Sequence, residues 1–222
     1  MTRTFQTLAF AATGLTAILI STSNAQADIV GVTGSIEVVE EMPASLELHQ
    51  FESSTRVPAM HESRVFLEDG VAVDFTAEQL YSGEEQLTPG EVGAGMWVDS
   101  YLLHIDPVAN ELVFNDGSIT FDGDVLGVIL LTQTLADTDP ILANPDTIYS
   151  DNYWRGVELG DHSPLDWLSL SEDRRTITLH AGTDSAMDEI RILTEVPAPG
   201  AGAALFAGLA LAGRRRRRVE HN

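Results

Sequence analysis

The chain of 222 residues contains no cysteine and no lysine. The absence of cysteine excludes disulfide bonds, thiolate metal sites and a cysteine nucleophile. No Gly-x-Ser-x-Gly sequence is present either, and Gly93-Ala94-Gly95 lacks the third glycine and the following helix of a phosphate-binding loop. The commonest hydrolase and nucleotide-binding signatures are therefore missing, and the folded part of the chain must depend on its apolar core or on a bound ion.

Positive charge is scarce in the long middle part of the chain, residues 28–195. This body holds 33 of the 34 acidic residues and only six of the twelve arginines, which gives a net charge of −27. Binding to nucleic acid or to an anionic membrane depends on basic patches, so this composition argues against both. Two explanations of the acidity stay open: solvation in a saline or calcium-containing exterior, and dedicated cation binding.

The first 27 residues have the pattern of a secretory signal peptide. Arg3 gives a charged beginning, residues 8–20 form an apolar stretch, and the small-x-small site Ala25-Gln26-Ala27 follows. This order of features predicts export and cleavage by signal peptidase before Asp28. An uncleaved N-terminal anchor is the alternative.

The C-terminus combines two prolines, an apolar stretch and a run of arginines. Val196, Pro197, Ala198 and Pro199 come first, and residues 198–213 contain no charged residue. As a helix, these residues would span about 24 Å, which is shorter than the roughly 30 Å hydrocarbon core of a bilayer. They predict a marginal transmembrane helix, whose cytoplasmic end is fixed by the basic residues that follow. Those residues are Arg214, Arg215, Arg216, Arg217 and Arg218.

This succession of parts resembles the PEP-CTERM sorting signal of bacterial exported proteins. In that family an exosortase recognises and processes the signal, so the resemblance implies an exosortase-type partner and delivery to the cell surface or extracellular matrix, in a bacterium that makes extracellular polysaccharide. The family's usual glutamate between the prolines is Ala198 here, and four residues follow the arginines. A plain C-terminal membrane anchor is the alternative.

The body has the pattern of a single all-β domain. Short apolar runs alternate with turn sequences such as Asn115-Asp116-Gly117. The stretch Thr176–His180 alternates polar and apolar residues and predicts a strand with one wet face, whereas Val125–Leu131 is apolar on both faces and predicts a central strand. Only residues 132–137 favour a short helix. The pattern predicts a β-sandwich of jelly-roll type, flanked by the signal peptide and the transmembrane helix.

The body is also similar to those of uncharacterised exported proteins that carry the same C-terminal signal. The similarity lies in residues 98–107, 117–121 and 125–129. It supports the predicted architecture and brings no activity with it.

Calcium is the first chemical hypothesis for so acidic a body, because this ion takes six to eight oxygen ligands without strict geometry. The densest donors lie in Asn115-Asp116-Gly117 with Asp122-Gly123-Asp124, and in Asp137-Thr138-Asp139, although neither group matches an EF-hand loop. Asp116, Asp122 and Asp124 are the candidate ligands. No pair among the six histidines has the spacing of a metal motif, and His61-Glu62 is interpreted as surface. Since Asn-Asp-Gly and Asp-Gly are also ordinary turn sequences, a calcium site and plain turns both stay open.

Three aromatic residues with polar neighbours lie in the most loop-like stretch, residues 141–162. They are Tyr149, Tyr153 and Trp154. Their ring faces could stack on sugars, and the alternative is that they pack over an end of the sandwich. Trp97 and Tyr101 lie in an alternating strand and are predicted to belong to the core.

Taken together, these patterns predict an exported, non-enzymatic protein of the cell surface or extracellular matrix. A structural or adhesive role is expected, with weak carbohydrate binding as its concrete form. The first alternative is a secreted glycosidase-like enzyme, which needs two carboxylates about 5–10 Å apart. With 33 acidic residues in the body, the sequence does not indicate which two would form that pair. The second alternative is a calcium-binding matrix component.

Overall fold

The computed structural model describes residues 28–160 and 166–196. The predicted signal peptide and the predicted sorting signal from Pro197 onward lie outside these residues, and Val196 is the last residue described. Within the described ranges, none of the helices combines the length and the apolar character that crossing a membrane requires. The two terminal signals therefore stay predictions.

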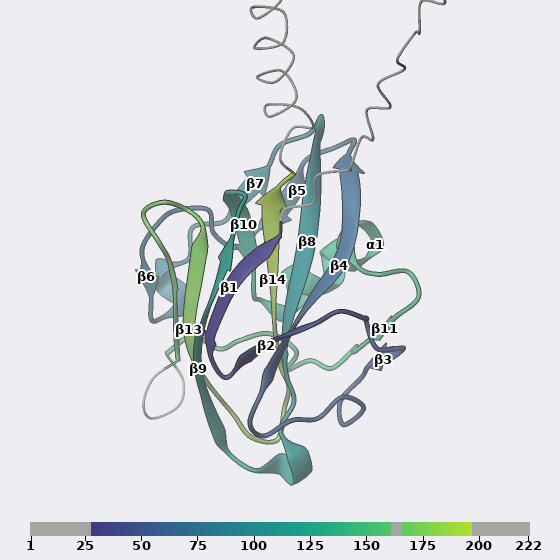
Figure 1. The fold of residues 1–222 in the computed structure, drawn as a ribbon, viewed down its shortest axis with the longest axis vertical. Coiled ribbons are helices and arrows are strands. Elements are labelled where there is room, and N and C mark those ends of the chain that lie inside the picture. Colours follow the sequence, from purple (N-terminus) through teal and green to yellow (C-terminus); the bar gives the residue numbers. More distant parts are fainter. Residues whose placement is uncertain (1–27, 161–165, 197–222) are drawn as a thin grey trace, which may run out of the picture. The chain divides into compact units, whose positions relative to one another are not determined.

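Two five-stranded sheets make up most of the body (Figure 1). The first sheet has the order β1 (Ile29–Gly34), β9 (Val113–Phe121), β13 (Thr176–Thr183), β12 (Trp167–Leu170) and β6 (Leu80–Tyr81). The second sheet has the order β10 (Val125–Ile129), β14 (Asp188–Glu195), β8 (Met96–Ile105), β4 (Val57–Leu67) and β2 (Ile36–Val39). Neighbouring strands are antiparallel except for β2 and β4, which are parallel.

The main apolar core lies between these two sheets. Because side chains alternate along a strand, β13 turns Ile177 and Leu179 into the core and Thr176 and Thr178 outward. The second sheet contributes buried residues such as Tyr101 and Ile190 to the same cluster. The predicted strand at Thr176–His180 and the all-β class are confirmed, and the two facing sheets give the body a sandwich-like architecture.

Smaller elements cover the other face of the second sheet. They are the strand pairs β3 (Ser45–Leu46) with β11 (Ile148–Tyr149) and β5 (Val71–Val73) with β7 (Gly90–Val92), and the helix α1 (Thr132–Leu142). Two 3-10 turns, Glu84–Gln86 and Val108–Asn110, lie in the connections from β6 to β7 and from β8 to β9. Leu135 and Leu142 of α1 pack with Val98, Ile129 and Leu193 of the sheet. The helix predicted over residues 132–137 is present and extends to Leu142.

The first five residues of the apolar stretch Val125–Leu131 form the edge strand β10, so the prediction of this stretch as a central strand was wrong. The open edge of β10 is covered by a short segment, because Asp74 N–H donates to the Val128 carbonyl at 2.9 Å and Val128 N–H donates to the Phe75 carbonyl at 3.0 Å. The core covers one face of β10, and the cluster around α1 covers the other. An edge strand enclosed in this way has the apolar composition of a central one.

Trp97 is exposed, contrary to prediction, whereas Tyr101 is buried as predicted. Both lie on one face of β8, but Trp97 is at the beginning of the strand and exposes 53% of its surface. It packs edge to face on the exposed Phe66 of β4, with ring centroids 5.5 Å apart. Between the two residues of β8, Asp99 pairs with Arg64, so on this face of the strand the apolar core ends at Asp99 and leaves Trp97 exposed to water.

Candidate functional site

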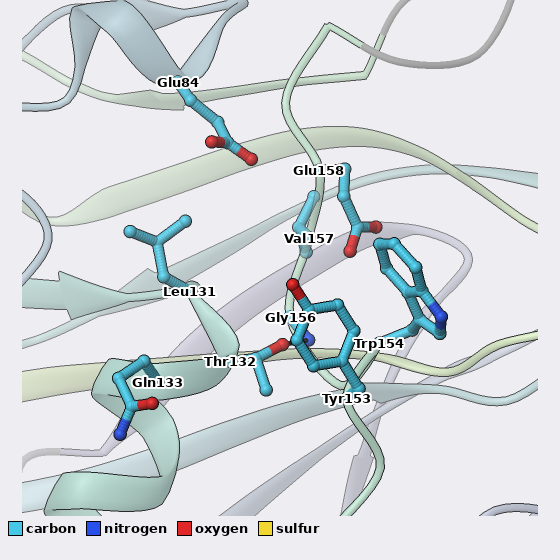
Figure 2. Close-up of a pocket in the computed structure, with 9 residues that line it drawn as sticks. All are labelled: Glu84, Leu131, Thr132, Gln133, Tyr153, Trp154, Gly156, Val157 and Glu158. Carbon is cyan, nitrogen blue, oxygen red and sulfur yellow. Dashed lines mark hydrogen bonds between the residues drawn. The ribbon is translucent and has the colours of Figure 1, made fainter.

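An exposed aromatic pair lies in the loop at residues 150–158. Tyr153 and Trp154 expose 76% and 55% of their surfaces, and their rings meet edge to face with centroids 4.8 Å apart. Both border an open cavity of about 320 Å³ (Figure 2). Figure 2 shows Glu158 beside Trp154, with Glu84 and Gln133 on the opposite side of the view.

The backbone of this loop is tied to the beginning of α1. Gly156 N–H donates to Thr132 Oγ1 at 2.8 Å, and Val157 N–H donates to the Leu130 carbonyl at 2.9 Å. Any larger residue at position 156 would bring a Cβ into the Leu130 carbonyl oxygen, so the close approach requires glycine. The aromatic pair is therefore displayed from an anchored segment.

Next to the loop lies a group of two arginines and three carboxylates, here named the arginine cluster, in which Asp139 is partly exposed and the other four side chains are buried. Its members are Arg155, Arg191, Glu62, Asp139 and Glu189. The interpretation of His61-Glu62 as surface was wrong for Glu62, which is buried by its pairing with Arg191. Arg155, the residue after Trp154, donates to Asp139 at 2.6 Å and also to Glu189. Arg191 donates to Glu62 at 2.7 and 2.9 Å and to Asp139 at 2.8 Å. Arg155 is buried and held by these bonds, so it fixes the part of the loop next to the exposed pair Tyr153 and Trp154.

Charge pairing within the arginine cluster outweighs the cost of burial. Burial alone would lower the pKa of Arg155, but attraction by Glu189 and hydrogen bonds to Asp139 raise it. Burial alone would raise the pKa of Glu189, but the hydrogen bond with His104 at 3.0 Å and the charge of Arg155 lower it. Both Arg155 and Glu189 therefore stay charged at neutral pH.

Tyr149 does not line the cavity. The guanidinium groups of Arg155 and Arg191 lie over its ring, 5.3 and 5.9 Å from the centroid. Its hydroxyl accepts the Asn144 N–H at 2.9 Å, and burial raises the pKa of the phenol. Of the three aromatic residues predicted to bind carbohydrate, the structure brings Tyr153 and Trp154 together, whereas Tyr149 packs against the arginine cluster.

The three aspartates predicted as calcium ligands each have a partner within the protein. Asp116 lies 2.6 Å from His180 Nδ1, Asp122 accepts a backbone N–H at 2.8 Å, and Asp124 pairs with Arg175 at 3.3 Å. Among the residues that the structure describes, they do not form a group whose donor atoms all lie within 4.8 Å of one another. The three aspartates are close in the sequence but do not share a site in the structure.

A group with that geometry does occur at His49, Glu52 and Asp106. His49 lies in the turn after β3, and Asp106 directly follows β8. Sequence analysis missed this group because Asp106 reaches the turn only through folding of the sheet. The three-residue spacing between His49 and Glu52 was the one signal available.

All six arginines in the described part of the chain form ion pairs with carboxylates. Two belong to the arginine cluster. The other four pairs are Arg56–Glu37, Arg64–Asp99, Arg174–Glu78 and Arg175–Asp124. An anionic ligand would therefore have to compete with a carboxylate for any arginine of the described ranges.

Comparisons of the chain with protein-family models, with curated proteins and with solved structures found no match.

Proposed function

We propose that this protein is an exported, non-enzymatic component of the cell surface or extracellular matrix that binds neutral carbohydrate weakly through Tyr153 and Trp154. The observation that carries the proposal is a pair of exposed aromatic rings at the border of a cavity, on a loop with an anchored backbone. Such rings offer apolar faces to a sugar, and their rigidity lowers the entropy lost on binding.

The charge of the body supports a neutral ligand. A net charge of −27 over residues 28–195 repels acidic polysaccharides. The arginines of the described ranges are engaged by carboxylates, which removes the usual partners for uronate or sulfate groups. Weak binding is expected because the cavity is open and only two aromatic rings of the described residues line it.

The proposed export rests on the sequence patterns at the two ends. Signal peptidase would act after Ala27, and an exosortase-type enzyme would recognise the stretch from Val196 to Arg218. Within the body, we propose that the two sheets form a jelly-roll-like sandwich. Non-consecutive neighbours such as β1 with β9 and β8 with β14 support that proposal.

A glycosidase-like enzyme is the alternative favoured by one specific observation, because Glu84 and Glu158 line the same cavity. Against it, the acid of a glycosidase sits in an apolar pocket that disfavours its charge, and Glu84 is exposed to water. A calcium-binding matrix protein has less support at Asp116, Asp122 and Asp124, since each has a protein partner.

The proposal is tested by titrating the purified full chain with neutral oligosaccharides in a calorimeter. Trp154→Ala is expected to weaken binding at least tenfold, because it removes one of the two rings. Trp97→Ala is the matched control, since Trp97 is equally exposed and does not line the cavity.

Three results would contradict the proposal: no binding at millimolar oligosaccharide, undiminished binding by the Trp154 variant, or equal losses in the two variants. Hydrolysis of an oligosaccharide that Glu84→Gln or Glu158→Gln abolishes would instead establish the enzymatic alternative.

A further inference from the structure

The turn after β3 is attached to the residue that follows β8. His49 N–H donates to Asp106 Oδ2 at 2.7 Å, and Ser53 N–H donates to the Asp106 carbonyl at 2.7 Å. These two bonds hold the turn on both sides of Glu52. They place the side chains of His49 and Glu52 next to the Asp106 carboxylate, at a position remote in sequence from the aromatic pair.

Three donor atoms converge at this position. His49 Nδ1 lies 2.8 Å from Glu52 Oε1 and 3.8 Å from Asp106 Oδ1, and all three donors lie within 4.8 Å of one another. Ligand atoms on a tetrahedral zinc ion, with bonds of about 2.0–2.1 Å, stand roughly 3.3 Å apart. Small side-chain rotations would therefore bring all three donors to bonding distance of a single ion.

Asp106 provides an observation independent of this clustering. Its side chain is fully buried, and Oδ1 has no hydrogen-bond partner among the residues that the structure describes. Oδ2 is already held by the His49 N–H, so Oδ1 is directed toward the His49 ring. A buried carboxylate oxygen without a donor is costly and rare, and a coordinated cation would satisfy it.

The ligand set selects the class of cation. An imidazole nitrogen together with carboxylate oxygens suits zinc and related transition metals, whereas calcium prefers a larger shell made only of oxygen. His49 and Glu52 are partly exposed, with 43% and 27% of their side chains accessible, so an ion can enter from solvent. We propose that His49, Glu52 and Asp106 form a binding site for a divalent transition-metal ion, with Zn²⁺ as the best match.

The proposal is tested by calorimetric titration of the purified full chain with Zn²⁺ at neutral pH. One ion per chain is expected to bind with micromolar affinity or better, and His49→Gln and Glu52→Gln should each weaken it at least tenfold. Both variants change exposed side chains, and circular dichroism checks that they fold. Calcium at the same ionic strength should not displace the zinc.

Two matched controls should keep the zinc affinity of the original chain. Glu47→Gln removes the same charge from the same turn, and Glu47 bonds to Ser45 outside the three-donor group. His180→Gln removes the histidine of another histidine–carboxylate pair. Trp154→Ala should also leave zinc binding unchanged, so failure of this site and failure of carbohydrate binding are distinguishable.

The proposal is overturned if the chain binds no zinc at micromolar concentration, or if the His49 and Glu52 variants bind it as tightly as the original chain. A loss in the Glu47 or His180 control equal to that of the site variants would overturn it as well.

Discussion

Strand β14 begins with two buried carboxylates whose surroundings differ. Glu189 belongs to the arginine cluster and contacts Arg155 and His104. Asp188 projects to the opposite face of the strand, where it accepts a hydrogen bond from the Thr183 hydroxyl. Of these two adjacent buried acids, Glu189 is therefore paired with a cation, whereas Asp188 has a neutral hydrogen-bond donor.

The two surroundings shift the two pKa values in opposite directions. Burial raises the pKa of Asp188 well above its usual value, and nearby carboxylates raise it further. For Glu189 the hydrogen bond with His104 and the charge of Arg155 overcome burial and lower the pKa. Two adjacent buried acids of one strand therefore differ in charge because only Glu189 has His104 and Arg155 beside it.

The largest expected effect comes from opening the arginine cluster. Arg191→Met keeps the volume and apolar stem of the side chain but leaves Glu62 buried without its two-bond partner. Removing one partner of a buried pair costs about 3–5 kcal/mol of unfolding free energy, measured by urea denaturation. Arg56→Gln is the control, because the exposed Arg56–Glu37 pair should contribute only about 0–1 kcal/mol. Equal losses of unfolding free energy in the two variants would refute the distinction between the buried and the exposed ion pair.

A smaller loss is expected for Glu189→Gln, which removes the charge but leaves Arg155 paired with Asp139. Weakening a charged hydrogen bond of this kind costs about 1.5–3 kcal/mol. Because the folded pKa of Glu189 is lowered, its contribution is present above the unfolded pKa and is lost as the pH falls through the folded value. The difference between variant and original chain should therefore shrink on acidification, and a constant difference would contradict this assignment.

The opposite sign is expected for Asp188→Asn, which keeps an acceptor for Thr183 and removes the charge. The raised pKa means that the stability linked to Asp188 is complete below the unfolded value of 3.8 and is lost as the pH rises through the folded value. Three further carboxylates add to this loss: Glu158, Asp166 and Asp184. The variant should melt at a higher temperature at neutral pH, with a gain that disappears in acid. A lower melting temperature at neutral pH would contradict the account.

Local patterns were enough to predict the class of the fold. The alternation at Thr176–His180 identified β13 because one face of that strand is in water. The same reasoning failed for β10, whose edge is covered by residues 74–75, and for Trp97, which lies beyond the end of the core at Asp99. In each failure the deciding contact comes from a segment distant in the sequence.

The candidate site could be predicted only in part for the same reason. Tyr153 and Trp154 were identified because the stretch around them is polar and irregular. Tyr149 looks equivalent in the sequence, but the guanidinium groups over its ring belong to residues placed by other elements. Asp106 likewise joins His49 and Glu52 only when β8 is in the sheet.

The most direct test of the proposed carbohydrate site is a magnetic resonance titration that follows the indole N–H signals of the three tryptophans. On addition of a neutral oligosaccharide that binds, the signal of Trp154 should shift in proportion to occupancy while that of the equally exposed Trp97 stays in place. A shift confined to Trp97 or Trp167, or binding that moves none of the three signals, would contradict the assignment of the site.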